Sequence, residues 1–363
     1  RDARRLHSAR VFASHDRGAT WAQVGAMDHQ FWPMLFTHRG GRYLIGTCKE
    51  YGDIVIRRST DGGRTWTEPK DEKSGLLFRG RFHCAPVPFA SFQGRLWRGF
   101  EEYTGEKDQW SGRFFRSFVV SVAEDAADLL DAANWRRTNG LDFNGDWLKG
   151  DRTGWLEGNV VVTPDQRLVN ILRIHTVPSL NDRFELEGPS AGYPRTEVAA
   201  VIQVDAAKNT VSFDPPHGFI HFPGSMSKFT IRYDAKSGRY WSLVQKVTNP
   251  YSGYHRDYQP NYQRNVLLLT SSADLKTWTE HAIVLRWREG LPIHRLDPVG
   301  FQYVDWQIEG DDLIAVCRTA WNGNNYHDSN FNPFHRVQNY RTLTPADSAP
   351  PVDAPPYRPP AAP

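Results

Sequence analysis

One eight-residue pattern occurs twice in this chain, and a shortened copy occurs a third time. The full copies have the form S-x-D-x-G-x-T-W and cover residues 14–21 and 59–66, whereas the copy at residues 272–278 lacks the glycine. The pattern describes a tight turn, because an Asp carboxylate accepts backbone N–H groups across such a turn and Gly supplies the required backbone freedom. The Thr starts the outgoing strand, and the Trp packs behind it. Three such turns, each after a β-rich run, predict a repeated β-unit.

The pattern resembles the Asp-box (BNR) repeat of the sialidase (neuraminidase) superfamily, which implies an all-β fold, a β-propeller of four-stranded antiparallel blades. Strand pairs joined by short polar turns recur, for example residues 34–38 and 42–48 across residues 39–41. We count five blades between about residue 31 and residue 344, and a half-blade before them. Restoring the two strands absent from that truncated first blade predicts six blades. The number is seven if two blades are counted here as one.

The domain organisation follows from the same repeats. Residues 1–344 are expected to form a single propeller domain, and the Pro- and Ala-rich residues 345–363 an extended or disordered tail. The first recognisable strand already leads into an Asp box, so the beginning looks truncated. We expect a secreted or periplasmic protein whose signal peptide is absent from this sequence.

Composition narrows the range of partners. The 363 residues carry a net charge of only +3, so no nucleic-acid partner is expected. No apolar run approaches transmembrane length, so we expect no membrane insertion. The 3 Cys are widely spaced and give neither a disulfide framework nor a zinc pattern. We expect a monomer without cofactor; a calcium ion on the propeller axis has no supporting ligand spacing.

Alternating turn lengths locate the candidate site. In a meander blade successive turns alternate between the two ends of the strands, and the short turns here share the Asp-box face. The long loops lie on the opposite face, and function is usually found on long loops carried by a rigid scaffold. Candidate residues at the front ends of the strands, or in these loops, are His29, Trp32, His83, Glu101, Trp155, Glu157, Arg173, Lys228, Arg318 and His327.

These residue types suit an acidic oligo- or polysaccharide. Arg173 and Arg318 can hold a substrate carboxylate in bidentate geometry, and Lys228, Trp155, His327 and Trp32 are further binding candidates. Glu157 interrupts an otherwise apolar run, so it needs a partner or a role. With Glu101 it can supply the acid and base, or nucleophile, of an exo-acting glycosidase. The leading interpretation is removal of a terminal sugar from a glycan that contains uronic or sialic acid.

Two alternatives remain open. His83 or His29 can remove the proton alpha to a uronate carboxylate, as in a polysaccharide lyase acting on rhamnosyl-glucuronate by β-elimination. The same propeller class includes such lyases and α-L-rhamnosidases. The chain departs from the sialidase pattern, because Phe31-Trp32-Pro33 lacks the Arg of an Arg-Ile-Pro motif and a third triad arginine is unassigned. A non-catalytic glycan-binding propeller is the other alternative.

Overall fold

Antiparallel β-strands make up most of the computed structural model, which describes residues 7–106, 111–148, 151–177, 197–248, 260–289 and 298–350. The first strands are β1 (Ser8–Ala13), β2 (Ala22–Asp28), β3 (Phe31–His38), β4 (Gly41–Thr47), β5 (Gly52–Ser59), β6 (Leu76–His83), β7 (Ala90–Phe92), β8 (Arg95–Tyr103), β9 (Phe115–Ala123), β10 (Trp135–Arg137) and β11 (Asp151–Val162). The later strands are β12 (Leu168–Val177), β13 (Val198–Asp205), β14 (Thr210–Ser212), β15 (Phe219–His221), β16 (Ile231–Asp234), β17 (Arg239–Gln245), β18 (Val266–Ser272), β19 (Trp278–Arg286), β20 (Val299–Glu309), β21 (Asp312–Trp321) and β22 (Phe334–Val337). Helix is limited, within the described ranges, to α1 (Pro215–Gly218) and short 3₁₀ turns, so the expectation of an all-β fold is confirmed.

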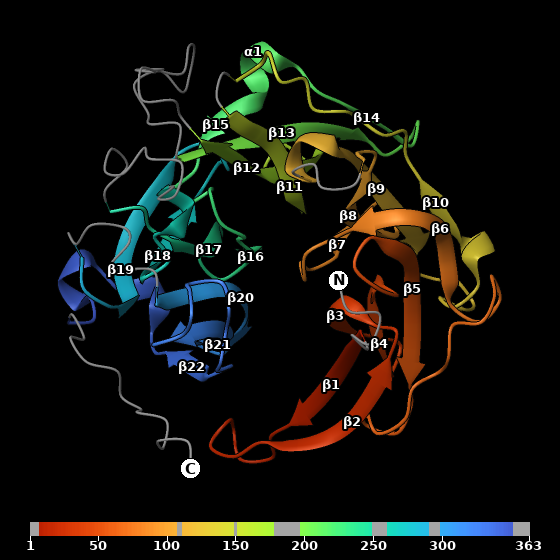
Figure 1. Cartoon of the computed structure of the whole chain (residues 1–363), viewed down its shortest axis with the longest axis horizontal. Helices are drawn as coiled ribbons and strands as arrows, with labels where there is room; N and C mark the ends of the chain where they lie inside the picture. Colours follow the sequence, from red (N-terminus) through yellow and green to blue (C-terminus); the bar gives the residue numbers. More distant parts are fainter. Residues whose placement is uncertain are drawn as a thin grey trace. The chain divides into compact units, whose positions relative to one another are not determined.

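The strands pair mostly with their neighbours in sequence, and colours therefore change gradually across each sheet in Figure 1. The sheets are β1–β2, an eight-stranded sheet from β3 to β10, a five-stranded sheet from β11 to β15, the four strands β16–β19, and β20–β22. The observed sheets therefore differ from the expected repeat of four strands in every blade. Pairing of β5 with β6 joins two expected blades into one sheet. The number of blades stays a prediction.

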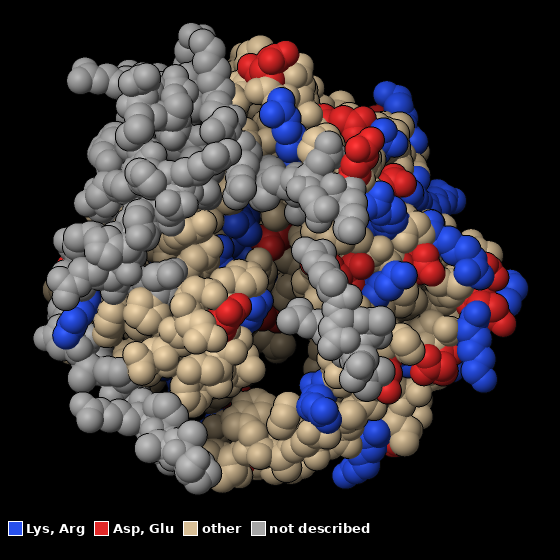
Figure 2. All heavy atoms as spheres, in the orientation of Figure 1, with Lys and Arg blue, Asp and Glu red and all other residues tan. Residues whose placement is uncertain are grey.

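Contacts between Cα atoms divide the chain into two compact units. Unit 1 comprises residues 1–145, 154–172 and 201–214, and unit 2 comprises residues 146–153, 173–200 and 215–363. Each unit has its own buried cluster of large side chains: Ile45, Ile56 and Phe118 are central in unit 1, and Trp241 and Trp306 in unit 2. On the drawn face of unit 1, basic and acidic side chains are interspersed rather than gathered by sign (Figure 2). The single-domain organisation stays a prediction.

The repeated turns have the hydrogen bonds that their sequence predicts. Asp16 accepts the backbone N–H of Thr20 at 2.8 Å, and Asp61 accepts that of Thr65 at 3.0 Å. In the shortened copy Asp274 accepts the N–H of Thr277 at 2.7 Å. These turns connect β1 to β2 and β18 to β19, and the middle one follows β5.

The shortened turn keeps the geometry without its glycine. Gly18 and Gly63 both have φ of 93°, in the left-handed region that suits glycine. At the corresponding point Leu275 has φ of 64°, and its side chain is 4% exposed. We infer that burial of this leucine offsets the cost of its backbone conformation.

Within unit 2, residues 345–350 contact β19. A 3₁₀ turn covers Pro345–Asp347, and the Ala349 N–H donates to the Ile283 carbonyl at 2.8 Å. The Ile283 N–H donates to the Ser348 hydroxyl at 3.0 Å. The start of the expected tail is therefore ordered along β19, and its remainder lies outside the described residues.

Replacing Asp16 tests the stabilising role of the repeated turn. Hydrogen bonds from the Thr20 hydroxyl, the Thr20 backbone and the Ser14 hydroxyl lower the pKa of Asp16 to about 2. A depressed folded pKa stabilises the fold above the unfolded value near 3.8 and loses that effect as pH falls towards about 2. Asp16→Asn should therefore lower the thermal midpoint at pH 7, with a difference that shrinks between pH 4 and pH 2.

Scanning calorimetry across this pH range checks the prediction, with the exposed Asp125→Asn variant as the control. The same midpoint for Asp16→Asn and the parent at pH 7 would contradict it.

Candidate functional site

The ten predicted site residues fall into the two units. His29, Trp32, His83, Glu101, Trp155 and Glu157 belong to unit 1; Arg173, Lys228, Arg318 and His327 belong to unit 2. We expect six of them to approach one pocket, and this stays a prediction: His83, Glu101, Glu157, Arg173, Lys228 and Arg318.

A buried His–Glu pair lies in unit 1. His83 ends β6 and is the direct cross-strand partner of Glu101 on β8. The His83 Nδ1 atom lies 2.8 Å from Glu101 Oε2, and the other oxygen, Oε1, accepts the Gly158 N–H at 3.2 Å. The side chains of His83 and Glu101 are 8% and 1% exposed. Both oxygens of Glu101 are thus engaged, which leaves it poorly placed to act on a substrate itself.

Aromatic rings fix the orientation of His83. The Phe115 ring stacks on the imidazole at 4.5 Å with an interplanar angle of 18°, and Trp32 meets it edge-on at 4.4 Å. Tyr51 lies 6.4 Å from the same ring. Trp32 and Tyr51 have φ of 45° and 52°. Such backbone conformations are costly for residues with side chains and concentrate at functional sites.

Glu157 directly precedes Gly158, whose backbone N–H donates to Glu101. Glu157 is 2% exposed within β11, and its φ is 62°. Burial raises the pKa of the Cys84 thiol to about 11, and the charges of Glu101 and Glu157 act in the same direction against that of Arg98. Because both carboxylates act on one thiol, Glu157 belongs to the same neighbourhood as His83 and Glu101. We call His83, Glu101 and Glu157 the acid–base cluster.

The structure also places Trp155 and His29, two further predicted site residues of unit 1. Trp155 is 0% exposed, and its indole N–H donates to the Phe115 carbonyl at 2.9 Å. A ring without exposed surface offers no stacking platform for a sugar, so the interpretation of Trp155 as a binding residue is wrong; it supports Phe115 instead. His29 is exposed between β2 and β3, and the described ring contacts of His83 do not include it.

Unit 2 contains a cluster of arginine and aromatic side chains. Arg318 donates from Nη2 to the His327 carbonyl at 2.7 Å and from Nε to the Ser329 hydroxyl at 3.2 Å. Its guanidinium carbon lies 5.2 Å from the centre of the Tyr303 ring. Arg318 therefore has fixed geometry, and it holds the loop that carries His327.

Arg264 is a second cation of this cluster, and the sequence interpretation missed it. It donates from Nε to the Asn261 carbonyl at 3.0 Å and from Nη1 to the Gln302 side chain. The Tyr326 ring centre lies 4.9 Å from its guanidinium carbon. Arg264 is 3% exposed, so its charge acts in surroundings of low polarity. We call Arg264, Arg318, His327, Tyr303 and Tyr326 the arginine cluster.

The pKa of His327 reflects both its partial burial and the positive charges of the arginine cluster. Partial burial and the neighbouring charges lower the pKa of His327 to about 4. Burial is the largest cause; Arg264, Arg318 and Arg173 act in the same direction, and Asp328 opposes them. At neutral pH the imidazole is therefore neutral beside fixed guanidinium groups. Such a site favours an anionic ligand.

Arg173 and Lys228 are more deeply placed than the sequence interpretation assumed. Arg173 is 4% exposed and donates from Nε to the Met226 carbonyl at 2.8 Å. Lys228 is 1% exposed, and its Nζ donates to the Thr230 hydroxyl at 2.6 Å and to the Val304 carbonyl at 2.7 Å. Through these hydrogen bonds Lys228 connects residues 228–230 to β20. Arg173 acts on His327 through its charge.

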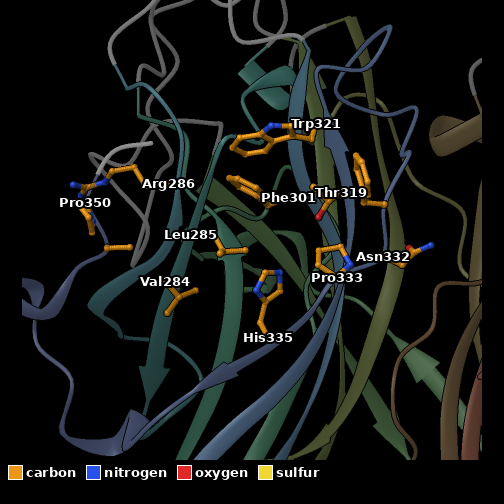
Figure 3. Close-up of a pocket in the computed structure, with 12 residues that line it drawn as sticks. Val284, Leu285, Arg286, Phe301, Thr319, Trp321, Asn332, Pro333, His335 and Pro350 are labelled. Atoms are coloured by element: carbon orange, nitrogen blue, oxygen red, sulfur yellow. The ribbon is translucent and has the colours of Figure 1, made fainter. Parts of the chain in front are cut away.

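A separate cavity of about 560 Å³ lies between β19 and the sheet β20–β22. Figure 3 shows Leu285, Phe301 and His335 facing the same space. Its walls are almost entirely apolar, whereas a sugar needs hydrogen-bond partners for its hydroxyl groups. We therefore do not assign this cavity to a glycan.

In the described part of the chain, no group of three or more His, Cys, Asp or Glu side chains could hold a metal ion. No helix in the described ranges is long and apolar enough to cross a membrane.

Comparison with known proteins adds support for the fold. No family model matches the chain, and no curated protein matches it. A protein of unknown function from Dyadobacter fermentans aligns with a TM-score of 0.52 and 13% identity, over 91% of this chain and 83% of that chain. A mutant alpha-L-arabinofuranosidase from Fusarium graminearum, in complex with an iminosugar inhibitor, aligns with a TM-score of 0.50 and 12% identity, over 91% and 84%. A Trypanosoma rangeli sialidase in complex with the inhibitor DANA gives 0.45 and 14% identity, over 92% and 52%.

At these low identities, the first two matches show similarity of fold alone. They place the chain among proteins built from the same arrangement of antiparallel sheets, and they are in keeping with a propeller.

Proposed function

We propose that this chain is a β-propeller glycoside hydrolase, an exo-acting glycosidase that removes a terminal sugar from an acidic glycan. The propeller has six blades, or seven, and its repeated turns are Asp boxes of the sialidase type. The observation that carries the proposal is the arginine cluster, where two guanidinium groups lie around a histidine whose pKa is lowered to about 4. The substrate is a uronic- or sialic-acid-containing oligo- or polysaccharide met outside the cell or in the periplasm.

The arginine cluster has the chemistry that an acidic sugar requires. Guanidinium groups bind carboxylates through paired, charge-assisted hydrogen bonds, and partial burial strengthens this attraction. The rings of Tyr326 and Tyr303 lie against the guanidinium groups of Arg264 and Arg318 and help to hold them in place.

The fold supports glycoside hydrolysis as the reaction, and it does not identify the substrate. The Fusarium graminearum neighbour is by name an arabinofuranosidase, so an arrangement of sheets like this one can carry glycoside hydrolysis. In unit 1, the acid–base cluster contributes two buried carboxylates and an imidazole. Among the described side chains, this cluster is the best candidate for moving protons in such a reaction.

A polysaccharide lyase is the second candidate, and the His83–Glu101 pair is the observation in its favour. An imidazole oriented by a carboxylate can also remove a proton alpha to a uronate carboxyl group. A non-catalytic glycan-binding protein would use the same arginine cluster and release no product.

Product analysis tests the proposed function. The full chain is incubated with sialosides, rhamnosyl-glucuronates and other uronate-containing oligosaccharides, and products are identified by mass spectrometry. We expect a terminal sugar and a shortened glycan whose masses together exceed that of the substrate by one water. An unsaturated uronate, detected by its ultraviolet absorbance, would show the lyase instead. Binding without any product would contradict both enzymatic candidates.

A further inference from the structure

The two members of the His83–Glu101 pair are not equivalent in their access to a substrate. The Glu101 side chain is 1% exposed, whereas 8% of the His83 side chain is exposed. We propose that His83 is the general base that deprotonates the attacking water, acting through Nε2. Glu101 is its positioning residue rather than an acid or base. This assignment rests on the proposed glycosidase function and replaces the sequence interpretation of Glu101 as an acid–base candidate.

The contacts of Glu101 leave it no free oxygen. Its Oε2 faces His83 Nδ1 at 2.8 Å, and its Oε1 accepts the Gly158 backbone N–H at 3.2 Å. A carboxylate bound in this way has its orientation fixed at both ends. Exchange of a proton with substrate would require a further contact at a buried carboxylate that already has one partner on each oxygen, whereas His83 can act while both of these contacts remain.

The same contacts determine which nitrogen of His83 is available. A carboxylate accepts hydrogen bonds and donates none, so His83 donates through Nδ1–H to Glu101. In the neutral imidazole this leaves Nε2 with the lone pair that a general base requires. Phe115 stacks on one face of the ring at 4.5 Å, and the edge contact with Trp32 at 4.4 Å opposes ring rotation. The pair is therefore preorganised for proton transfer at Nε2.

The proton and electron movements balance with residues of unit 1 alone. Nε2 of His83 takes a proton from water as the water oxygen bonds to the anomeric carbon. The glycosidic C–O bond breaks with its electron pair on the leaving oxygen, which takes a proton from Glu157. The proton on His83 then passes through solvent to the Glu157 carboxylate, so that both residues regain their starting forms. The net reaction consumes one water.

Three variants of the full chain test this assignment: His83→Gln, Glu101→Gln and the control Glu102→Gln. Glu102 follows Glu101 on β8 but pairs with Arg137. We expect kcat to fall about 10²- to 10⁴-fold in the first two variants, with KM changed less than about threefold. Glu102→Gln should keep kcat within about twofold. Thermal midpoints of all variants show whether a loss arises from unfolding.

Nitrogen-15 NMR of the imidazole gives a readout that needs no activity. In the neutral imidazole of the parent we expect a proton on Nδ1 of His83 and none on Nε2, and in Glu101→Gln a mixture of both tautomers. A parent with the proton on Nε2, or a Glu101→Gln variant with unchanged kcat, would overturn the assignment. So would a loss in Glu102→Gln equal to that in Glu101→Gln, or an unsaturated uronate as product.

Failure of the proposed function and failure of the His83 assignment give different results. If no acidic glycan is turned over, the proposed function fails, while the NMR measurement still decides the pairing: a proton on Nδ1 that depends on Glu101 supports the positioning role, and a proton on Nε2 overturns it.

Discussion

Replacing Glu157 by glutamine is expected to lower kcat about 10²- to 10⁴-fold while KM changes little. The amide keeps the shape of the carboxyl group but cannot donate or accept the proton that bond cleavage requires. Glu157 is 2% exposed with φ of 62°, a costly placement for a residue without a role. Steady-state kinetics on the cleaved glycan measure the effect.

Glu50→Gln is the control for this substitution, since Glu50 is exposed just after β4. Equal thermal midpoints for parent and Glu157→Gln would attribute the loss to chemistry rather than to unfolding. If Glu157→Gln keeps kcat within about threefold of the parent, the glycosidase assignment of Glu157 fails.

Arg264→Lys is expected to weaken binding of an acidic sugar about 10- to 100-fold, which corresponds to about 1.4 to 2.8 kcal/mol. Lysine keeps the positive charge but cannot reproduce the planar contacts of Arg264 with Gln302 and Tyr326. Titration calorimetry with a uronic or sialic acid oligosaccharide measures the change in Kd.

Arg336→Lys is the matched control, because Arg336 on β22 is engaged with Glu309 and Asp312. Its affinity for the acidic sugar should equal that of the parent. Equal losses in both variants, or none in Arg264→Lys, would contradict recognition of the sugar by the arginine cluster.

The repeated turns could be predicted because all their determinants are local. The Ser, Asp, Thr and Trp that form each turn are a few residues apart, and their mutual hydrogen bonds define its shape. The pairing of β3 with β4 across residues 39–41 was predicted for the same reason. By contrast, the pairing of β5 with β6 joins strands separated by a long connection, and nothing in their local pattern indicates it.

The site could be predicted only in part. His83 and Glu101 were placed at strand ends, but their cross-strand register depends on long-range pairing. Trp155 was misread because abundant tryptophan suits both packing and sugar binding, and only its burial distinguishes the two. Arg264 lies at the end of a long loop without a motif, and its contacts with Gln302 and Tyr326 come from distant parts of the sequence.

The most direct test of the central claim is an NMR titration of His327, with and without a uronic acid oligosaccharide and with its neutral methyl ester. In the free protein, partial burial and the guanidinium groups of Arg264 and Arg318 lower the pKa of His327 to about 4. A carboxylate bound at the arginine cluster would offset that positive potential and favour the imidazolium form. The account predicts a higher pKa with the acidic sugar and little change with the methyl ester. An unchanged pKa with the acidic sugar at saturation, or equal changes with both ligands, would contradict it.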